Sequence, residues 1–278
     1  KVDVEMTAEV RGTQEKRVIA PGVKHIVAIS SGKGGVGKST VTVNLACALA
    51  ATGAKVGILD ADVYGPNVPV MLGLDGHPKG DNSGRIVPLE AHGIRAMSVG
   101  FLVEDGQPVM WRGPMLHKAL EKFLREVDWG ELDYLVIDLP PGTSDSPLTI
   151  MQALTLDGFI VVTTPQELAR IDAMRSINMV RKMNVKVVGV VENFSGDIFG
   201  YGAGEELAQE AAVAFLGRLE LRGDYRDTSR PTVLNSRKVL KEYTGVIREA
   251  KAALDAVARG ESRRVRARLY DETDGLRS

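Results

Sequence analysis

The stretch Ser31–Thr40, which reads SGKGGVGKST, constrains the fold more than any other part of this sequence. It follows an apolar run at His25–Ser30 and comes directly before another apolar segment. Its spacing is that of a phosphate-binding loop, G-x-x-x-x-G-K-[ST], with the residues Gly32, Gly37, Lys38 and Ser39. In such a loop the backbone N–H groups and the following helix N-terminus face phosphate oxygens. The sequence therefore predicts a strand–loop–helix unit that binds a nucleotide.

Further apolar runs alternate with segments of helical spacing along the chain. Strands are expected at 25–30, 55–60, 93–100, 132–138, 158–164 and 185–193, and helices at 39–53, 115–127, 166–183, 205–215 and 235–260. Residues 64–93 are rich in Gly, Pro and Asp and are expected to be mostly loop. Strands that are apolar without interruption are buried on both faces. The fold class is thus predicted as α/β, a doubly wound, mostly parallel sheet with helices on both faces.

The helix expected at 166–183 places Leu168, Ile171 and Val180, together with Met174 and Ile177, on one side. We interpret this side as core. The alternative is an adaptable surface for a client protein, because methionines recur along this helix.

Composition limits the classes of function. The 278 residues carry a net charge of −1, so we expect no nucleic-acid partner. One cysteine, Cys47, rules out a disulfide framework and favours a cytoplasmic protein. No apolar run is long enough to span a bilayer. Residues 261–278 are highly charged and are interpreted as a solvated tail, so we expect no stable membrane association; a basic membrane-binding helix is the alternative.

Three carboxylates follow predicted strands and are expected at the same sheet edge as the phosphate loop. Asp60 and Asp62 come after the strand at 55–60, and Asp138 ends the strand at 132–138. Ser39, Asp138 and Asp60 are the candidate Mg²⁺ ligands, because Mg²⁺ takes oxygen ligands together with phosphates. Asp62 is the candidate that orients the attacking water.

The remaining candidate residues surround the phosphates of a nucleotide such as ATP. Lys38 is expected to bridge the β- and γ-phosphates, and Gly142 offers a backbone N–H to the γ-phosphate. The candidate nucleotide-binding residues of the loop are Gly32, Gly34, Gly35, Val36, Gly37, Lys38, Ser39 and Thr40.

Several long motifs resemble a known family. KGGVGKST resembles the deviant Walker A motif of MinD/ParA-like P-loop ATPases. ILDADVYGPNVPVMLG, WGELDYLVIDLPPGTSD and VVTTPQELARIDAMRSINMVRKMNV resemble more specifically the Mrp/NBP35/ApbC family. The likeness covers residues 23–260, expected as one P-loop ATPase domain. Residues 1–22 resemble the end and linker of a preceding MIP18/DUF59-like domain, and 261–278 form the tail.

The resemblance implies a Mg²⁺-dependent ATPase that works as a homodimer. In this class Lys33 corresponds to a lysine that reaches the nucleotide of the partner subunit, and its catalytic logic resembles that of an arginine finger. Asn193 matches a position that contacts adenine. Family members are described as iron–sulfur cluster carriers, so the resemblance also implies a [4Fe–4S] cluster and client apoproteins that receive it.

One departure from the family concerns the cluster ligands. Many members carry a CxxC motif after the VEN strand, and two such pairs supply four thiolates to a bridging cluster. Here VENFSGDIFGYGAGEELA lacks both cysteines, and Cys47 lies in an apolar helix. An alternative function is therefore a nucleotide-switch ATPase without a cluster, acting on a protein client or in MinD/ParA-like positioning.

Overall fold

The computed structural model describes residues 20–102, 113–143 and 145–259. Within them the main sheet has the strand order β10-β9-β8-β1-β7-β2-β6-β5, and β3 and β4 form a separate pair. The strands are β1 (Val23–Ser31), β2 (Val56–Asp60), β3 (Lys79–Gly80), β4 (Ile86–Val87), β5 (Leu89–Ala91), β6 (Ile94–Ser98), β7 (Leu132–Asp138), β8 (Gly158–Thr163), β9 (Val187–Ser195) and β10 (Ala214–Glu220). In the main sheet β5 pairs antiparallel with β6 and the other pairs are parallel.

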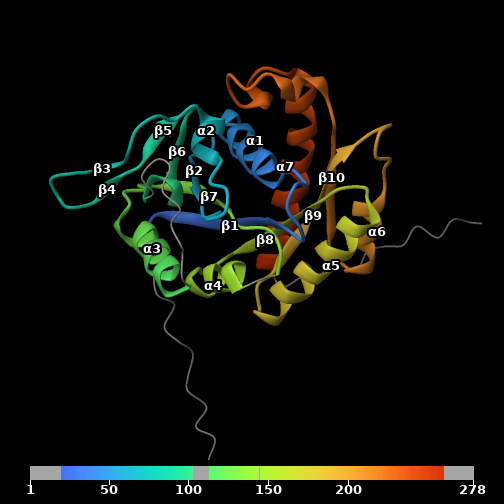
Figure 1. Cartoon of the computed structure of the whole chain (residues 1–278), viewed down its shortest axis with the longest axis horizontal. Helices are drawn as coiled ribbons and strands as arrows, with labels where there is room; N and C mark the ends of the chain where they lie inside the picture. The colour runs from blue at the N-terminus through green and yellow to red at the C-terminus, as the bar shows by residue number, and fades with distance from the viewer. Residues whose placement is uncertain (1–19, 103–112, 144, 260–278) are drawn as a thin grey trace, which may run out of the picture.

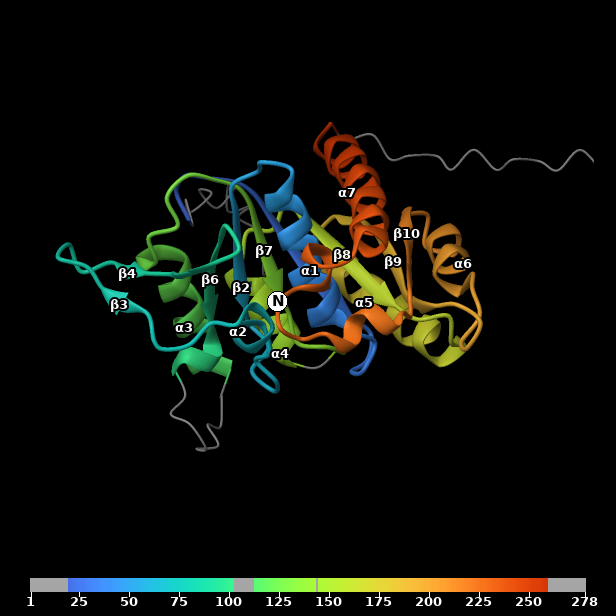
Figure 2. The same cartoon turned by 90° about the horizontal axis from the view of Figure 1, so that it is seen from above.

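Helices cover both faces of this sheet (Figures 1 and 2). They are α1 (Lys38–Ala51), α2 (Val68–Leu72), α3 (Gly113–Glu126), α4 (Asp145–Ala153), α5 (Glu167–Lys182), α6 (Ala203–Glu210) and α7 (Arg237–Ala258). One apolar core forms where α1, α2 and α7 pack on the sheet, and a second forms under α3, α4, α5 and α6. The predicted doubly wound, mostly parallel sheet is therefore confirmed.

Burial on both faces explains the apolar strands. Every residue of β2 and β8 is buried, because the helices of both cores contact these central strands. Asp60 pairs in register with Asp138 across β2 and β7, so two predicted site residues are neighbours at the sheet edge.

Two local details differ from the expectation. The helix expected at 205–215 ends at Glu210, and the chain then turns through Ala212 at φ 49° into edge strand β10. Helix α4 was not expected. The segment 64–93 is mostly loop as expected, and it also contains α2 and three short strands. Tertiary pairing and packing stabilise these short elements, whose local patterns are weak.

Helix α5 is rotated relative to the predicted core side. Leu168 is 71% exposed and Ile171 is 37% exposed, whereas Ile177 and Val180 are buried as expected. The methionines Met174, Met179 and Met183 are partly buried against the second core, which agrees with the core interpretation.

Residues 1–19 and 260–278 lie outside the described residues. The N-terminal remnant and the C-terminal tail therefore stay predictions. Among the helices of the described ranges, none has the length and apolar character that crossing a bilayer requires.

Two phenylalanines provide a matched test of where the stability lies. Phe159 in β8 is fully buried, whereas Phe199 is 40% exposed. Phe159→Ala should lower the free energy of unfolding by about 3–5 kcal/mol through lost burial and a new cavity. Phe199→Ala should lower it by less than about 1 kcal/mol. Urea unfolding of both variants measures the difference, and equal losses would contradict the described core.

Candidate functional site

Residues 32–37 connect β1 to α1 as a loop. Gly35 and Gly37 have φ of +80° and +79°, a conformation that glycine adopts without strain. The Ser31 hydroxyl donates to the Lys33 carbonyl at 2.8 Å. The loop thus has the strand–loop–helix context that the sequence predicted.

Gly37 also has no room for a side chain. A Cβ there would lie 2.4 Å from Nδ2 of Asn193 and 3.0 Å from the Phe194 ring. Asn193 donates to the Val36 carbonyl at 2.8 Å and so fastens β9 to the loop. A Cβ on Gly32 would lie 2.1 Å from the backbone of Asp172 in α5. The loop is therefore clamped between two neighbouring elements.

Lys38 lies at the centre of a buried charge cluster. Its ammonium donates to Asp138 Oδ1 at 2.8 Å and forms an ion pair with Asp62 Oδ2 at 3.2 Å. The exposed fraction is 6% for Lys38, 0% for Asp138 and 6% for Asp62. The structure brings together three predicted site residues that lie up to 100 positions apart in the sequence.

Asp138 also accepts hydrogen bonds from two hydroxyls of α1. The Ser39 hydroxyl donates to Oδ2 at 2.6 Å, and the Thr42 hydroxyl lies 2.9 Å from Oδ1. A hydroxyl and a carboxylate side by side next to a phosphate loop form a donor set that suits Mg²⁺. Ser39 and Asp138 fit that ion as adjacent ligands.

Asp60 faces a different set of partners. Its carboxylate accepts the N–H groups of Asp62 at 3.1 Å and Val68 at 3.2 Å, and the Ser98 hydroxyl at 3.1 Å. Burial, followed by the neighbouring Asp138 carboxylate, raises the pKa of Asp60 to about 7. These contacts hold the loop that carries Asp62, and a metal role for Asp60 stays a prediction.

The raised pKa of Asp60 makes the free energy of folding depend on pH. The folded state favours the protonated Asp60 carboxyl, whereas an Asp in the unfolded chain has a pKa of about 3.9. Between these two values the folded chain binds more protons, so this group makes folding less favourable as pH rises towards 7.

The cleft beside this cluster is large and is named the P-loop cleft below. It measures about 740 Å³, within the range of about 300–1,000 Å³ that small-molecule sites occupy. Its lining includes the loop, Asp62, Asn193 and the segment 221–232, represented by Leu221, Tyr225 and Thr232. Sequence reasoning missed this last segment, which has no motif; the Val233 N–H joins it to α1 through Asn44 Oδ1 at 2.9 Å.

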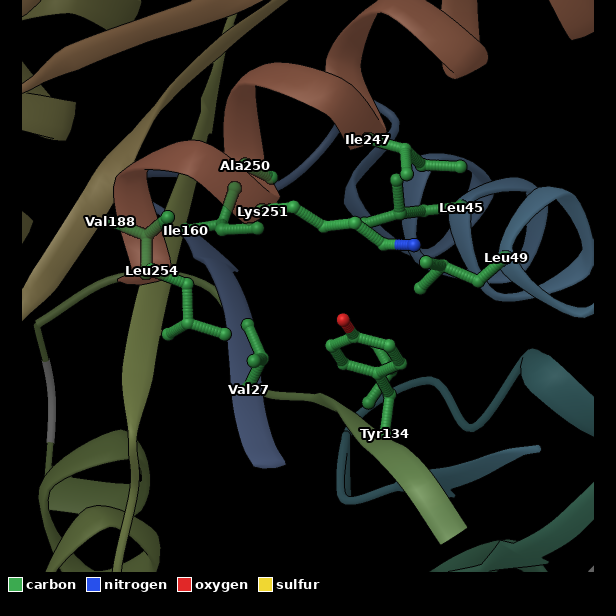
Figure 3. Close-up of a pocket in the computed structure, with 11 residues that line it drawn as sticks. Val27, Leu45, Leu49, Tyr134, Ile160, Val188, Ile247, Ala250, Lys251 and Leu254 are labelled. Atoms are coloured by element: carbon green, nitrogen blue, oxygen red, sulfur yellow. The ribbon is translucent and has the colours of Figure 1, made fainter. Parts of the chain in front are cut away.

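A second, smaller cavity lies between α1, α7 and the sheet (Figure 3). It measures about 40 Å³ and its lining is almost wholly apolar, including Val27, Leu45 and Leu254. The Lys251 ammonium lies 5.6 Å from the centre of the Tyr134 ring at this cavity. Room for about three water molecules in an apolar lining indicates a packing gap rather than a nucleotide site.

The surroundings of two other predicted residues, Lys33 and Gly142, could not be read from the sequence. Lys33 is half-buried, and its ammonium has no ion-pair partner within the described ranges. Gly142, with φ +92°, donates its N–H to the Ser31 carbonyl at 2.8 Å. Gly142 thus joins the segment after β7 to the end of β1, and its γ-phosphate role stays a prediction.

The loop after β9 is short and internally closed. Gly196 and Gly200 exchange two backbone hydrogen bonds, at 3.1 and 2.7 Å. The buried Glu192 carboxylate accepts the N–H groups of Gly202 and Gly204 at the start of α6. The tip exposes Ile198, which is 75% exposed.

Thiolate ligands for an iron–sulfur cluster are missing from this loop. Cys47 is buried in α1, and desolvation raises the pKa of its thiol to about 12, which disfavours the thiolate that binds metal. No group of three or more His, Cys, Asp or Glu side chains suited to a metal ion occurs in the described part of the chain. The described residues do not fit a cluster held by this chain's own thiolates.

Comparison with known proteins decides the family. The family described as NUBPL iron-transfer P-loop NTPase, of the ParA group, matches residues 22–251. This chain belongs to that family. The match covers the described elements from β1 into α7.

Relatives with curated names agree with this assignment. An iron–sulfur cluster carrier protein from Synechocystis sp. is 48% identical over 246 residues, which cover 82% of this chain and 69% of that protein. One of the same name from Methanocaldococcus jannaschii is 47% identical over 242 residues, covering 81% of this chain and 83% of that protein.

Solved structures agree as well. A nucleotide-binding protein from Archaeoglobus fulgidus in complex with ADP has a TM-score of 0.68 and 36% identity, over 80% of this chain and 91% of that one. The cell division ATPase MinD of Pyrococcus furiosus has a TM-score of 0.67 and 22% identity, over 82% and 99% of the two chains, and shows the shared fold. The family and fold expected from the motifs are confirmed.

Two loop glycines test the clamp on the P-loop. Gly37→Ala should lower the free energy of unfolding by about 1–3 kcal/mol, because its Cβ meets Asn193 and its φ is positive. Gly34→Ala is the control: its Cβ would come no closer than 3.9 Å to Pro141, so the loss should stay within about 0.5 kcal/mol. Urea unfolding of both chains measures these losses. A Gly37→Ala chain as stable as the Gly34→Ala chain would refute the clamp.

Proposed function

We propose that this chain is a Mg²⁺-dependent ATPase that acts as a homodimer and serves client apoproteins of iron–sulfur metabolism. The observation that carries the proposal is the buried ion pair of Lys38 and Asp138 next to a phosphate loop, with the Ser39 hydroxyl on the same carboxylate. The relatives named as cluster carriers support the client class. We also propose that the protein is cytoplasmic, binds no nucleic acid and does not associate stably with membranes.

The mechanism assigns one role to each side chain. Lys38 binds the β- and γ-phosphates of ATP, and the backbone of residues 32–40 surrounds the phosphates. Ser39 and Asp138 would hold Mg²⁺, and the bound ion would supply positive charge next to the phosphates. Asp62 orients the attacking water, and Asp60 positions Asp62 through the backbone.

Lys33 is proposed to act on the nucleotide of the partner subunit. Its ammonium lacks an ion-pair partner among the described residues, so it is available to another molecule. A cation supplied in trans would stabilise transition-state charge as an arginine finger does. Asn193 and Gly142 are proposed as contacts to adenine and the γ-phosphate. Asn193 lines the P-loop cleft, and Gly142 directly follows Pro141, which lines it as well.

A mixing experiment tests both the ATPase site and the dimer. Lys38→Ala should abolish nucleotide binding, and Lys33→Ala should keep binding but lower kcat by about 10³-fold. Mixing the two variants should restore part of the ATPase activity, because one site of the mixed dimer has an intact Lys38 and receives Lys33 from the other chain. Steady-state phosphate release measures the recovery. A mixture as inactive as its components would contradict a role for Lys33 in trans.

The closed loop at 196–200 favours a second candidate, a nucleotide switch that binds its client without carrying a cluster. Its support is the tight Gly196–Gly200 pairing in place of a CxxC segment, together with the buried, protonated Cys47. This candidate shares the ATPase mechanism and differs in the cargo.

Anaerobic reconstitution with iron and sulfide distinguishes the two candidates. The wild-type chain and Cys47→Ser should both bind far less than one cluster per dimer by iron and acid-labile sulfide assays, since thiolate ligands are missing. As the positive control, Ile198→Cys/Tyr201→Cys places a CxxC at two exposed positions and should gain a cluster. A stoichiometric cluster in Cys47→Ser would overturn the ligand argument.

A further inference from the structure

A second groove lies along the outer edge of the sheet, apart from the P-loop cleft. It measures about 620 Å³ and is formed by β10 and α7; no residue lines both it and the P-loop cleft. It is named the β10 groove below, and its lining includes Phe215, Gly217, Arg218, Lys238, Lys241 and Gly245. Figure 1 shows β10 and α7 side by side at this edge.

Two lysines give the β10 groove positive charge. Lys238 and Lys241 are exposed on the first turns of α7 and have no ion-pair partner within 4.0 Å in the ranges that the structure describes, although Asp224 interacts with Lys238 over a longer distance. By contrast, Arg222 pairs with Glu242 and Glu220, and Arg248 with Glu249. The groove therefore offers two ammonium groups without a direct ion pair to an anionic partner.

The groove has open space at Gly245 of α7. Gly245 stands inside this helix, where glycine costs about 1 kcal/mol relative to alanine. A Cβ on Gly245 would meet nothing within 4 Å, so close packing does not require this glycine. On the strand side, Gly217 has φ +142° and interrupts the register of β10, and a Cβ there would lie 3.1 Å from Val246 of α7. Gly245 thus leaves space beside the basic side chains, and Gly217 allows the strand to approach the helix closely.

The strand beside the groove has a free backbone edge. β10 is the last strand of its sheet, and within the described residues no other strand pairs with its outer side. On this side the Glu220 N–H approaches the Glu242 carboxylate at a long 3.4 Å. An extended peptide can use such backbone donors and acceptors by adding along a sheet edge.

We propose that the β10 groove binds an acidic, extended segment of a partner protein. Its carboxylates would pair with Lys238 and Lys241, and its backbone would lie along β10. A nucleic acid suits the groove less well, because Phe215, the aromatic residue of the lining, is covered by the Arg218 guanidinium, 5.2 Å from the ring centre, and is not free to stack on a base. The proposal is independent of the ATPase site.

The test uses fluorescence anisotropy of a labelled peptide of alternating glutamate and valine, titrated with the full chain at fixed salt. Lys238→Glu/Lys241→Glu should weaken binding by about tenfold or more, because it reverses the charges that meet the carboxylates. Gly245→Trp should weaken it similarly by filling the groove without a change of charge. Both variants should keep wild-type ATPase activity, since neither residue touches the P-loop cleft.

The matched control is Lys118→Glu/Lys122→Glu, which makes the same charge change on exposed positions of α3, on the opposite face of the sheet. It should change the affinity by less than about twofold, since exposed charges at a distance are screened. Equal weakening by the control, unchanged binding in Gly245→Trp, or no saturable binding to the wild type would overturn the proposal. Tighter binding of a labelled oligothymidylate in the same groove would also overturn it, in favour of nucleic acid.

Discussion

The ion pairs of Lys38 hold the site of this protein together. Its ammonium forms ion pairs with both Asp138 and Asp62, and all three side chains are buried. A buried charge without its partner costs about 3–5 kcal/mol, so the cluster requires the P-loop, β7 and the Asp62 loop in fixed relative positions. The fold meets that requirement by pairing β1 with β7 and β7 with β2 in parallel register.

The same cluster explains how structure leads to chemistry. Lys38 and Ser39 begin α1, so the helix N-terminus, the ammonium and the hydroxyl all point to one small volume. Asp60 adds a second layer, because it holds the loop of Asp62 through backbone N–H groups rather than through the cluster itself. The positions of the charged groups are therefore fixed by the ends of the strands and the start of α1 that carry them.

The loop after β9 has no cysteines, although the chain belongs to the iron-transfer P-loop NTPase family. Glu192 accepts backbone N–H groups at the start of α6, and Gly196 and Gly200 pair across the connection. The clamp on the P-loop through Asn193 is kept in full beside this loop. The contact that fastens the P-loop and the short connection to α6 thus depend on different residues after the same strand.

The sequence by itself determined the fold class, the P-loop and the carboxylates at the strand ends, because each depends on local spacing and on apolar runs that the chain order alone displays. It also showed that the CxxC motif is missing. Only the tertiary structure decided that Asp60 anchors a loop, that Leu168 and Ile171 are exposed on α5, and that 221–232 lines the P-loop cleft. Strand β10 and its basic groove likewise became visible only in three dimensions. The physical reason is that these features arise from contacts between segments far apart in the chain, whose energies no local pattern records.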